Sequence, residues 1–164
     1  MRFRIFLAFA LLFTLATVAS AQTKISGTAQ CGKPDQQHAI EVGDRPNHSF
    51  VIAQAKCTWT KTFEIAGSES KDYVGTNFQE VSGNSATFQG SGFGTMASGD
   101  KYFVRLRGKA TLKDGALDTA EDTWSFAGGT GKLKGIKGKG TTKGRGAADG
   151  SATYEVEGEY ELPK

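Results

Sequence analysis

Glycine and lysine dominate the segment SFAGGTGKLKGIKGKGTTKGRG, residues 125–146, which contains no acidic residue. Glycine-rich loops of this kind bind phosphate through their backbone amides when the loop joins a strand to a helix. A P-loop requires Ser or Thr after its Gly-Lys pair, but the pairs at 131–132 and 138–139 are followed by Leu and Gly. No helical apolar period follows either pair. The segment therefore does not carry the pattern of a nucleotide site.

The lysines of this segment are also candidates for contact with the phosphates of a nucleic acid. However, the segment has no interleaved aromatic residues on which bases could stack, and Glu alternates just as regularly at positions 155, 157, 159 and 161. Antiparallel pairing through a turn near Ala148–Gly150 would set a row of lysines beside this row of glutamates. We therefore predict a cross-strand charge row and no nucleic-acid partner; a basic surface that binds an acidic polymer is the alternative.

Two charged residues fall on predicted strand faces that are otherwise apolar. Lys61 shares its face with Trp59 and Phe63, and Asp122 shares its face with Trp124. Inside a barrel, Lys61 and Asp122 would form an ion pair or contact a ligand, whereas a bulge or a strand end would turn them outward. The candidate ligand-binding residues are Trp59, Lys61, Phe63, Tyr102, Asp122 and Trp124. For the aromatic side chains among them, a packed core is the alternative.

The two histidines do not form a recognisable catalytic or metal site. His38 and His48 precede the longest predicted strand and lack metal-ligand spacing to each other or to a carboxylate cluster. We expect both in a surface loop. The sequence shows no Ser-His-Asp motif, although residues distant in sequence can assemble one in space. The sequence therefore predicts no metal and no cofactor, and it assigns no catalytic residue.

The elements that would position these residues are β-strands, because no window shows a sustained apolar period of 3.6 residues. Apolar and polar residues instead alternate, with the period of a half-buried strand, along Val51–Ile65, Lys101–Leu112, Asp118–Phe126 and Tyr154–Leu162. Further strands are predicted at Thr23–Gln30, Gln37–Val42, Lys71–Val81, Ser85–Met96 and Gly131–Thr142.

Short turn signals separate these strands at regular spacing, as at Ser82–Asn84, Ser98–Asp100 and Lys113–Gly115. Consecutive strands with short turns predict an antiparallel meander, and closure into a barrel removes its exposed edges. Glycines inside strands, as in FQGSGFG, allow the coiling that a small barrel needs. The predicted fold class is all-β, with a single barrel domain over residues 22–164.

The first 21 residues have the organisation of a secretory signal peptide. Arg2 and Arg4 precede an apolar run, and Ala19-Ser20-Ala21 provides the small residues of a cleavage site after Ala21. An uncleaved membrane anchor is the alternative. Loss of the two arginines lowers the formal net charge from +3 to +1, so the basic balance of the whole chain does not indicate a nucleic-acid partner. We predict a periplasmic or secreted protein without membrane contact after cleavage.

Cys31 and Cys57 are the two cysteines of the chain. In an oxidising compartment an even pair of cysteines predicts a disulfide. A pair of buried free thiols is the alternative. A metal site is not indicated, because no His or acidic cluster accompanies them.

The segment FAGGTGKLKGIKGKGT, residues 126–141, resembles a segment typical of allene oxide cyclase and dirigent barrels and their bacterial exported relatives. There a strand ends in Gly-Gly-Thr-Gly, and a hydrophobic residue and Gly-x-x-Gly follow. DTWSF at 122–126 and GEYEL at 158–162 also stand where such barrels place their last strands, and the likeness extends from Ala86 onward. The resemblance implies an eight-stranded, antiparallel, calycin-like barrel. It places none of the family's active-site residues on this chain.

Three functions are compatible with these features. The first is non-covalent binding of a small, partly apolar or amphipathic molecule by the barrel. The second is an isomerase or cyclase acting on a lipid-derived or phenolic substrate, with Asp122 or Lys61 as polar groups in the lumen. The third is a periplasmic interaction or inhibitor protein. The sequence carries no signal for the oligomeric state.

Overall fold

The computed structural model describes residues 22–163, and the predicted signal peptide over residues 1–21 lies outside the described residues. Within 22–163, no helix has the length and apolar character of a membrane span. The elements are the strands β1 (Thr23–Cys31), β2 (Gln36–Glu41), β3 (His48–Lys61), β4 (Glu64–Ile65), β5 (Ser68–Ser82), β6 (Ser85–Met96), β7 (Lys101–Lys113), β8 (Ala116–Gly129), β9 (Lys137–Gly146) and β10 (Ala152–Glu161), with one 3-10 turn, η1 (Gly131–Leu133).

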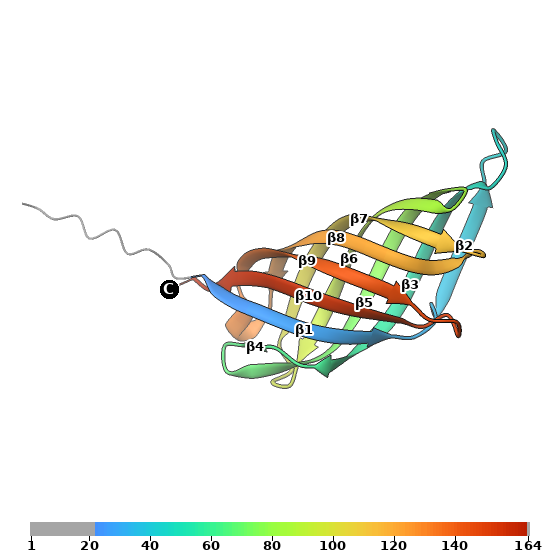
Figure 1. Ribbon diagram of the computed structural model, residues 1–164. Coiled ribbons are helices and arrows are strands. Elements are labelled where there is room, and N and C mark those ends of the chain that lie inside the picture. Colours follow the sequence, from blue (N-terminus) through green and yellow to red (C-terminus); the bar gives the residue numbers. More distant parts are fainter. Residues whose placement is uncertain (1–21, 164) are drawn as a thin grey trace, which may run out of the picture.

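The eight strands β1, β3 and β5 to β10 form a closed antiparallel barrel (Figure 1). Closure occurs at β3, which pairs with β5 along one edge and with β1 along the end of the other edge. The strands of the barrel are staggered. A row of directly opposed residues that starts at Ser49 of β3 and passes around the barrel from strand to strand returns to β3 at Trp59 instead of at Ser49. The expected all-β barrel of eight antiparallel strands is confirmed, with β2 and β4 as additional strands.

Two predicted strands differ from the observed elements. The strand expected over Val51–Ile65 is divided, because β3 ends at Lys61 and β4 begins at Glu64. The strand expected over Gly131–Thr142 begins only at Lys137. Its first residues form η1 and a turn instead, since Gly131 and Gly135 have φ angles of 50° and 79° that an extended strand does not accept.

The residues displaced from the strand close one end of the barrel. Leu133 and Ile136 are buried there, and they belong to one apolar cluster with Ile65 of β4, Met96 of β6 and Phe63. The glycine positions of this segment therefore bend the chain so that two apolar side chains plug the barrel. The first part of the Gly-Lys segment therefore has a structural role, which is to close one end of the barrel.

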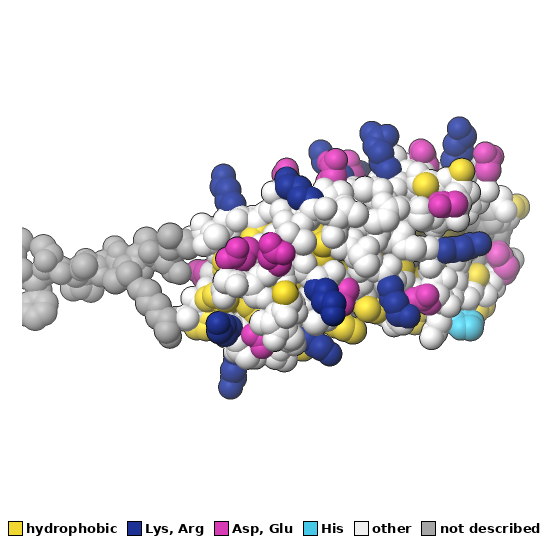
Figure 2. Space-filling view, turned by 90° about the horizontal axis from the view of Figure 1, so that it is seen from below, with side chains coloured by type: hydrophobic (Ala, Val, Ile, Leu, Met, Phe, Trp, Pro, Cys, Tyr) yellow, Lys and Arg dark blue, Asp and Glu magenta, His cyan; other side chains and the backbone are white. Residues whose placement is uncertain are grey.

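The predicted charge row is present on the outer face of the barrel. Lys137, Lys139 and Lys143 of β9 stand opposite Glu161, Glu159 and Glu155 of β10. On the other side of β9, Lys143 stands opposite Glu121, and Glu121 stands opposite Lys109 of β7. Lys132 and Lys134 take no part, because they precede β9. Figure 2 shows basic and acidic side chains interspersed on the face that it views.

Aromatic rings inside the barrel lie against glycines that face inward. A β-carbon at Gly158 would lie 2.5 Å from Cζ2 of Trp124, and the same ring also covers Gly140 on the neighbouring strand. Tyr154 covers Gly144 in the same way, and Tyr102 covers Gly94. Glycines inside strands thus create the space that these large side chains occupy.

The disulfide between Cys31 and Cys57 is confirmed, and it joins directly opposed residues of β1 and β3. The two cysteines are 26 residues apart in the chain, so on the chain-entropy model the bond stabilises the fold by about 3.5 kcal/mol. It marks the point where β1 ends. Beyond it, β2 continues the line of β1 along the same edge of β3.

The fit between Trp124 and its glycines gives the first prediction. Gly140→Ala places a methyl group in the Trp124 ring and against the Glu157 carbonyl, so it should lower the free energy of unfolding by about 1–3 kcal/mol or more. Gly32→Ala is the matched control, because a β-carbon there meets no atom within 4 Å, and it should change stability by no more than about 0.5 kcal/mol. Urea unfolding measures both. Equal stability of the two variants would contradict the proposed packing.

Candidate ligand site in the barrel lumen

Five polar side-chain atoms lie buried at inward-facing positions without a hydrogen-bond partner among residues 22–163. They are Trp59 Nε1, Tyr73 Oη, Asn77 Oδ1, Tyr102 Oη and Asp122 Oδ1. Buried polar atoms in native proteins are nearly always paired, because each unpaired atom costs about 1–3 kcal/mol. Five in one barrel interior therefore identify the lumen as the candidate functional site.

Three of these atoms form a row along β6. The side-chain oxygens of Asn77, Tyr73 and Tyr102 lie against Gly90, Gly92 and Gly94, in that order, where β-carbons would otherwise stand. These glycines occupy successive inward positions of one strand, so the oxygens follow each other at a spacing of roughly 6–7 Å. The FQGSGFG sequence thus provides a backbone floor for a line of polar groups.

Asp122 lies beside this row on β8, between Gly108 of β7 and Thr142 of β9. Burial raises the pKa of its carboxyl from 3.8 to about 6, and the Thr142 side chain opposes the shift. Burial also raises the pKa of the Tyr73 and Tyr154 hydroxyls, and in both cases the charge of Asp122 adds to the effect. The carboxyl is therefore within electrostatic reach of two phenols.

A continuous series of aromatic contacts lines the lumen beside the polar row. Trp59 packs edge-on against Phe63 at a centroid distance of 4.7 Å, and Phe63 lies 5.9 Å from Tyr102. Tyr102 in turn packs edge-on against Phe126 at 5.8 Å, and Phe126 against Trp124 at 5.2 Å. The structure thus brings together four of the six candidate residues.

Of the other two candidates, Asp122 belongs to the same lumen and Lys61 does not. Lys61 is exposed at the end of β3, opposite Thr28, where the pairing of β1 with β3 shifts register at a bulge. The strand-end alternative therefore describes Lys61, and no ion pair with Asp122 is formed. Among the two polar groups considered for an isomerase, Asp122 alone faces the lumen.

Sequence reasoning missed Tyr73 and Asn77, although both lie on the predicted strand Lys71–Val81. Their inward face carries Gly, Asn and Gln as well as Tyr, so it does not read as apolar. The usable signal was on the neighbouring strand, where Gly90, Gly92 and Gly94 occupy one face. Three glycines in alternate positions predict that large side chains from the neighbouring strands lie across that face.

The arrangement offers three donors, from two phenols and an indole, and two acceptors, from an amide and a carboxyl. Such a set suits a molecule with oxygen-containing polar groups on an apolar frame. Within residues 22–163, no three His, Cys, Asp or Glu side chains come together as metal ligands would.

Two open grooves lie on the outer face of the barrel. The larger, of about 1350 Å³, crosses β1 and β6 to β10 and is lined by side chains of both charges, among them Arg105, Arg107 and Glu157. The second, of about 850 Å³, includes Asp122 and Gly108 in its wall.

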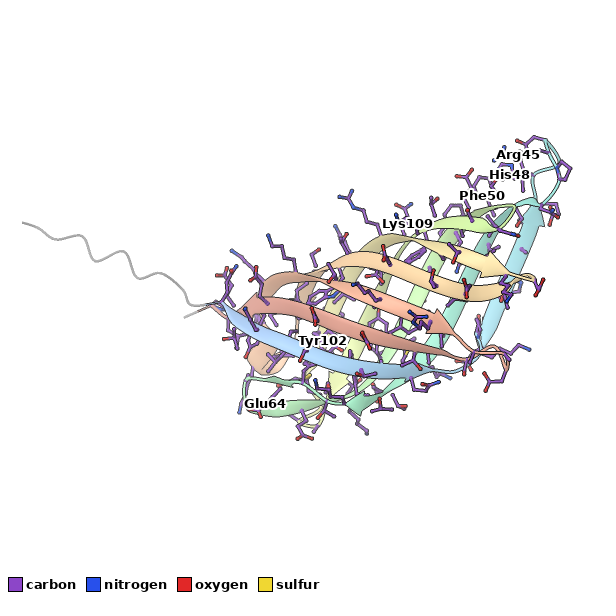
Figure 3. The ribbon with its side chains drawn as sticks, in the orientation of Figure 1. Arg45, His48, Phe50, Glu64, Tyr102 and Lys109 are labelled. Carbon is purple, nitrogen blue, oxygen red and sulfur yellow. A yellow bond between two sulfur atoms is a disulfide. The ribbon has the colours of Figure 1, made fainter. Side chains whose placement is uncertain are left out.

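The expectation that both histidines lie in a surface loop is wrong. His38 lies within β2, and His48 is the first residue of β3, where its side chain is buried. Nδ1 of His48 contacts Asp44, and Nε2 lies 3.1 Å from Oε1 of Glu80 on β5. Hydrogen bonding to Asp44 raises the pKa of His48. The His48 side chain therefore links Asp44, in the loop before β3, to Glu80 on β5. This contact lies at the end of the barrel away from Tyr102 (Figure 3).

No protein-family model and no curated protein matches the chain. Among solved structures, a DUF3224-family protein of unknown function from Shewanella oneidensis aligns with 88% of this chain and 99% of its own, at 16% identity and a TM-score of 0.52. A pterocarpan synthase dirigent protein aligns over 96% and 100%, at 9% identity and a TM-score of 0.49. A pyocyanin demethylase aligns over 81% and 98%, at 19% identity and a TM-score of 0.43. The likeness to the Shewanella protein is one of fold.

The raised pKa of Asp122 predicts a specific pH dependence of stability. Because the folded-state pKa, about 6, exceeds the ordinary value of 3.8, ionisation of Asp122 disfavours the folded state. Its penalty is absent below about pH 4 and complete above about pH 6, where it reaches on the order of 1–2 kcal/mol for this half-buried group. Asp122→Asn removes the titrating group. As the pH rises across that window, the unfolding free energy of the variant should therefore exceed that of the native protein by an increasing amount. Parallel curves of unfolding free energy against pH would contradict this prediction.

Proposed function

We propose that the protein binds a small, partly apolar molecule non-covalently in the barrel lumen. The observation that carries the proposal is the set of five buried polar atoms without protein partners. A ligand that pairs with them would recover the desolvation free energy that they cost the unliganded protein. Binding of this kind requires no catalytic group, and the lumen residues supply both its polar and its apolar parts.

The donors and acceptors indicate the class of ligand. Tyr73, Tyr102 and Trp59 would donate to carbonyl or hydroxyl oxygens, while Asn77 and Asp122 would accept from hydroxyl groups. The rings of Phe126 and Trp124 would cover an apolar or aromatic frame. A phenolic or oxygenated lipid-derived molecule has both features.

We also propose that the barrel is of the allene oxide cyclase and dirigent type. The Gly-Gly-Thr-Gly sequence lies at the end of β8 and the start of η1, and Leu133, the hydrophobic residue that follows it, plugs the barrel. The motif thus has a physical role in barrel closure, which supports the resemblance. The proposed assignment concerns the scaffold and carries no active-site residue.

We propose further that residues 1–21 direct export and that residues 22–164 form the mature protein. The Cys31–Cys57 disulfide supports this, because structural disulfides persist in oxidising compartments. Intact mass spectrometry of the protein recovered from the periplasm or medium should give a chain that begins at Gln22. A chain that retains Met1 in the membrane fraction would contradict export by cleavage.

The unpaired hydroxyls predict an opposition between stability and binding. Tyr73→Phe removes a buried hydroxyl that has no protein partner, so it should raise the unfolding free energy of the unliganded protein by about 1 kcal/mol or more. The same change should weaken ligand binding by about tenfold, since it deletes one donor. Binding is measured by the fluorescence of Trp59 and Trp124 with phenolic and fatty-acid-derived probes, and by native mass spectrometry of the purified protein.

Tyr160→Phe is the matched control, because Tyr160 also faces the lumen but its hydroxyl is not among the buried unpaired atoms. It should change neither stability nor binding. Loss of stability in Tyr73→Phe, or tryptophan emission that no probe and no co-purified molecule alters, would contradict the proposal.

A further inference from the structure

The strand β2 is a part of the sheet that barrel closure leaves open. It continues the line of β1 along β3, but β10, the neighbour of β1, begins at Ala152 opposite Cys31 and does not extend beside β2. Among residues 22–163, no strand pairs with the outer edge of β2, and all six of its residues are exposed. Figure 1 shows β2 projecting beyond the barrel. An exposed edge of this kind is a template for another strand.

The hydrogen-bonding groups of that edge can be assigned by residue. Val42 N donates to His48 O, so in the alternating antiparallel ladder the even-numbered residues of β2 bond to β3. The N–H and C=O groups of Gln37, Ala39 and Glu41 therefore point to the free edge.

An apolar patch adjoins this edge on the outer face of the sheet. Ile40 of β2 stands opposite Phe50, and Ile52 stands opposite Phe78 of β5. Ile40 is 72% exposed and Ile52 50% exposed, and the rings of Phe50 and Phe78 stack at 5.3 Å. Contiguous exposed apolar residues of this kind mark association sites in soluble proteins. We call Ile40, Phe50, Ile52 and Phe78 the β2 patch.

The two ends of the described chain lie far from β2. Thr23 pairs with Tyr160 at the end of the barrel that Leu133 plugs, whereas β2 projects from the other end (Figure 1). Neither end of residues 22–163 is therefore placed to cover the edge.

We propose that β2 pairs antiparallel with β2 of a second copy of this chain, about a two-fold axis through Ala39. A two-fold axis perpendicular to the sheet keeps residues of like face opposite each other, so only registers that pair odd with odd residues are allowed. With the axis at Ala39, Gln37 of each copy stands opposite Glu41 of the other. All three residues whose backbone groups point to the free edge are then paired.

This register also joins the two β2 patches. His38 and Ile40 lie on the outer face of β2. In this register, His38 of one copy stands opposite Ile40 of the other copy. Each Ile40 therefore lies between Phe50 of its own copy and His38 of the second copy. No two like charges are opposed, because Glu41 is the one charged residue of β2 and it faces Gln37. One symmetric interface thus pairs the free β2 edges of both copies and leaves neither of them open for further growth.

The test is the oligomeric state of the purified protein by sedimentation from about 1 µM to about 1 mM. We expect a reversible dimer, and Ala39→Pro should raise its dissociation constant by at least about tenfold. The substitution removes an N–H that points away from β3, so the β2–β3 ladder and the unfolding free energy of the single copy should be retained. Ala39→Val is the matched control, since it keeps the N–H and should dimerise as the native protein does.

Hydrogen exchange provides the second measurement. The amides of Gln37, Ala39 and Glu41 should exchange slowly in the native dimer. In Ala39→Pro, which has no amide hydrogen at position 39, the amides of Gln37 and Glu41 should exchange rapidly. A native protein that stays monomeric, or a dimer that Ala39→Pro and Ala39→Val leave equally strong, would overturn the proposal. Protection of these amides only after addition of a different protein would overturn it as well and assign the edge to a foreign strand.

Discussion

The barrel depends on the close fit between inward-facing glycines and the aromatic rings of neighbouring strands. Trp124 lies over Gly140 and Gly158, Tyr154 lies over Gly144, and Tyr73 and Tyr102 lie over glycines of β6. Without these glycines, eight strands with such large side chains could not close around them, because each added methyl group would overlap a ring or a backbone carbonyl. The chain therefore combines many inward-facing glycines with large aromatic side chains.

The same fit produces the polar row in the lumen. A tyrosine ring that lies flat on a glycine carries its hydroxyl to a position fixed by the backbone of that strand, and there it meets peptide groups already used in the sheet ladder. The hydroxyls of Tyr73 and Tyr102 therefore remain unpaired within residues 22–163. Unpaired groups reduce stability, and proteins keep such local conflicts chiefly where they serve a function. The packing that closes the barrel thereby also builds the candidate site.

Much of the fold was predictable because alternation survives in the sequence wherever one strand face is buried. Asp118–Phe126 and Tyr154–Leu162 are of this kind, and the strand Ser85–Met96 was predicted with its observed bounds. The disulfide followed from the count of cysteines. The start of β9 was not predictable from period, because Leu133 and Ile136 alternate with lysines as strand residues would, while their burial is decided by the end of the barrel that they fill. Part of the site was predictable, because Asp122 is a charged residue on an otherwise apolar strand face. Tyr73 and Asn77 were not predictable, because their strand face does not read as apolar.

The polar row and the free edge of β2 are departures from the same rule, that buried or strand-forming polar groups are paired within the fold. They lie at different levels of the barrel, and the Cys31–Cys57 bond stands between β2 and the closed part of the sheet. That covalent link joins β1 to β3 at the last pair before β2. A second chain bound at β2 would pair with the outer edge of that strand, whereas Tyr102 packs against Phe63 and Phe126 inside the barrel. The two features therefore involve different residues, and a substitution at the edge of β2 leaves every residue of the polar row in place.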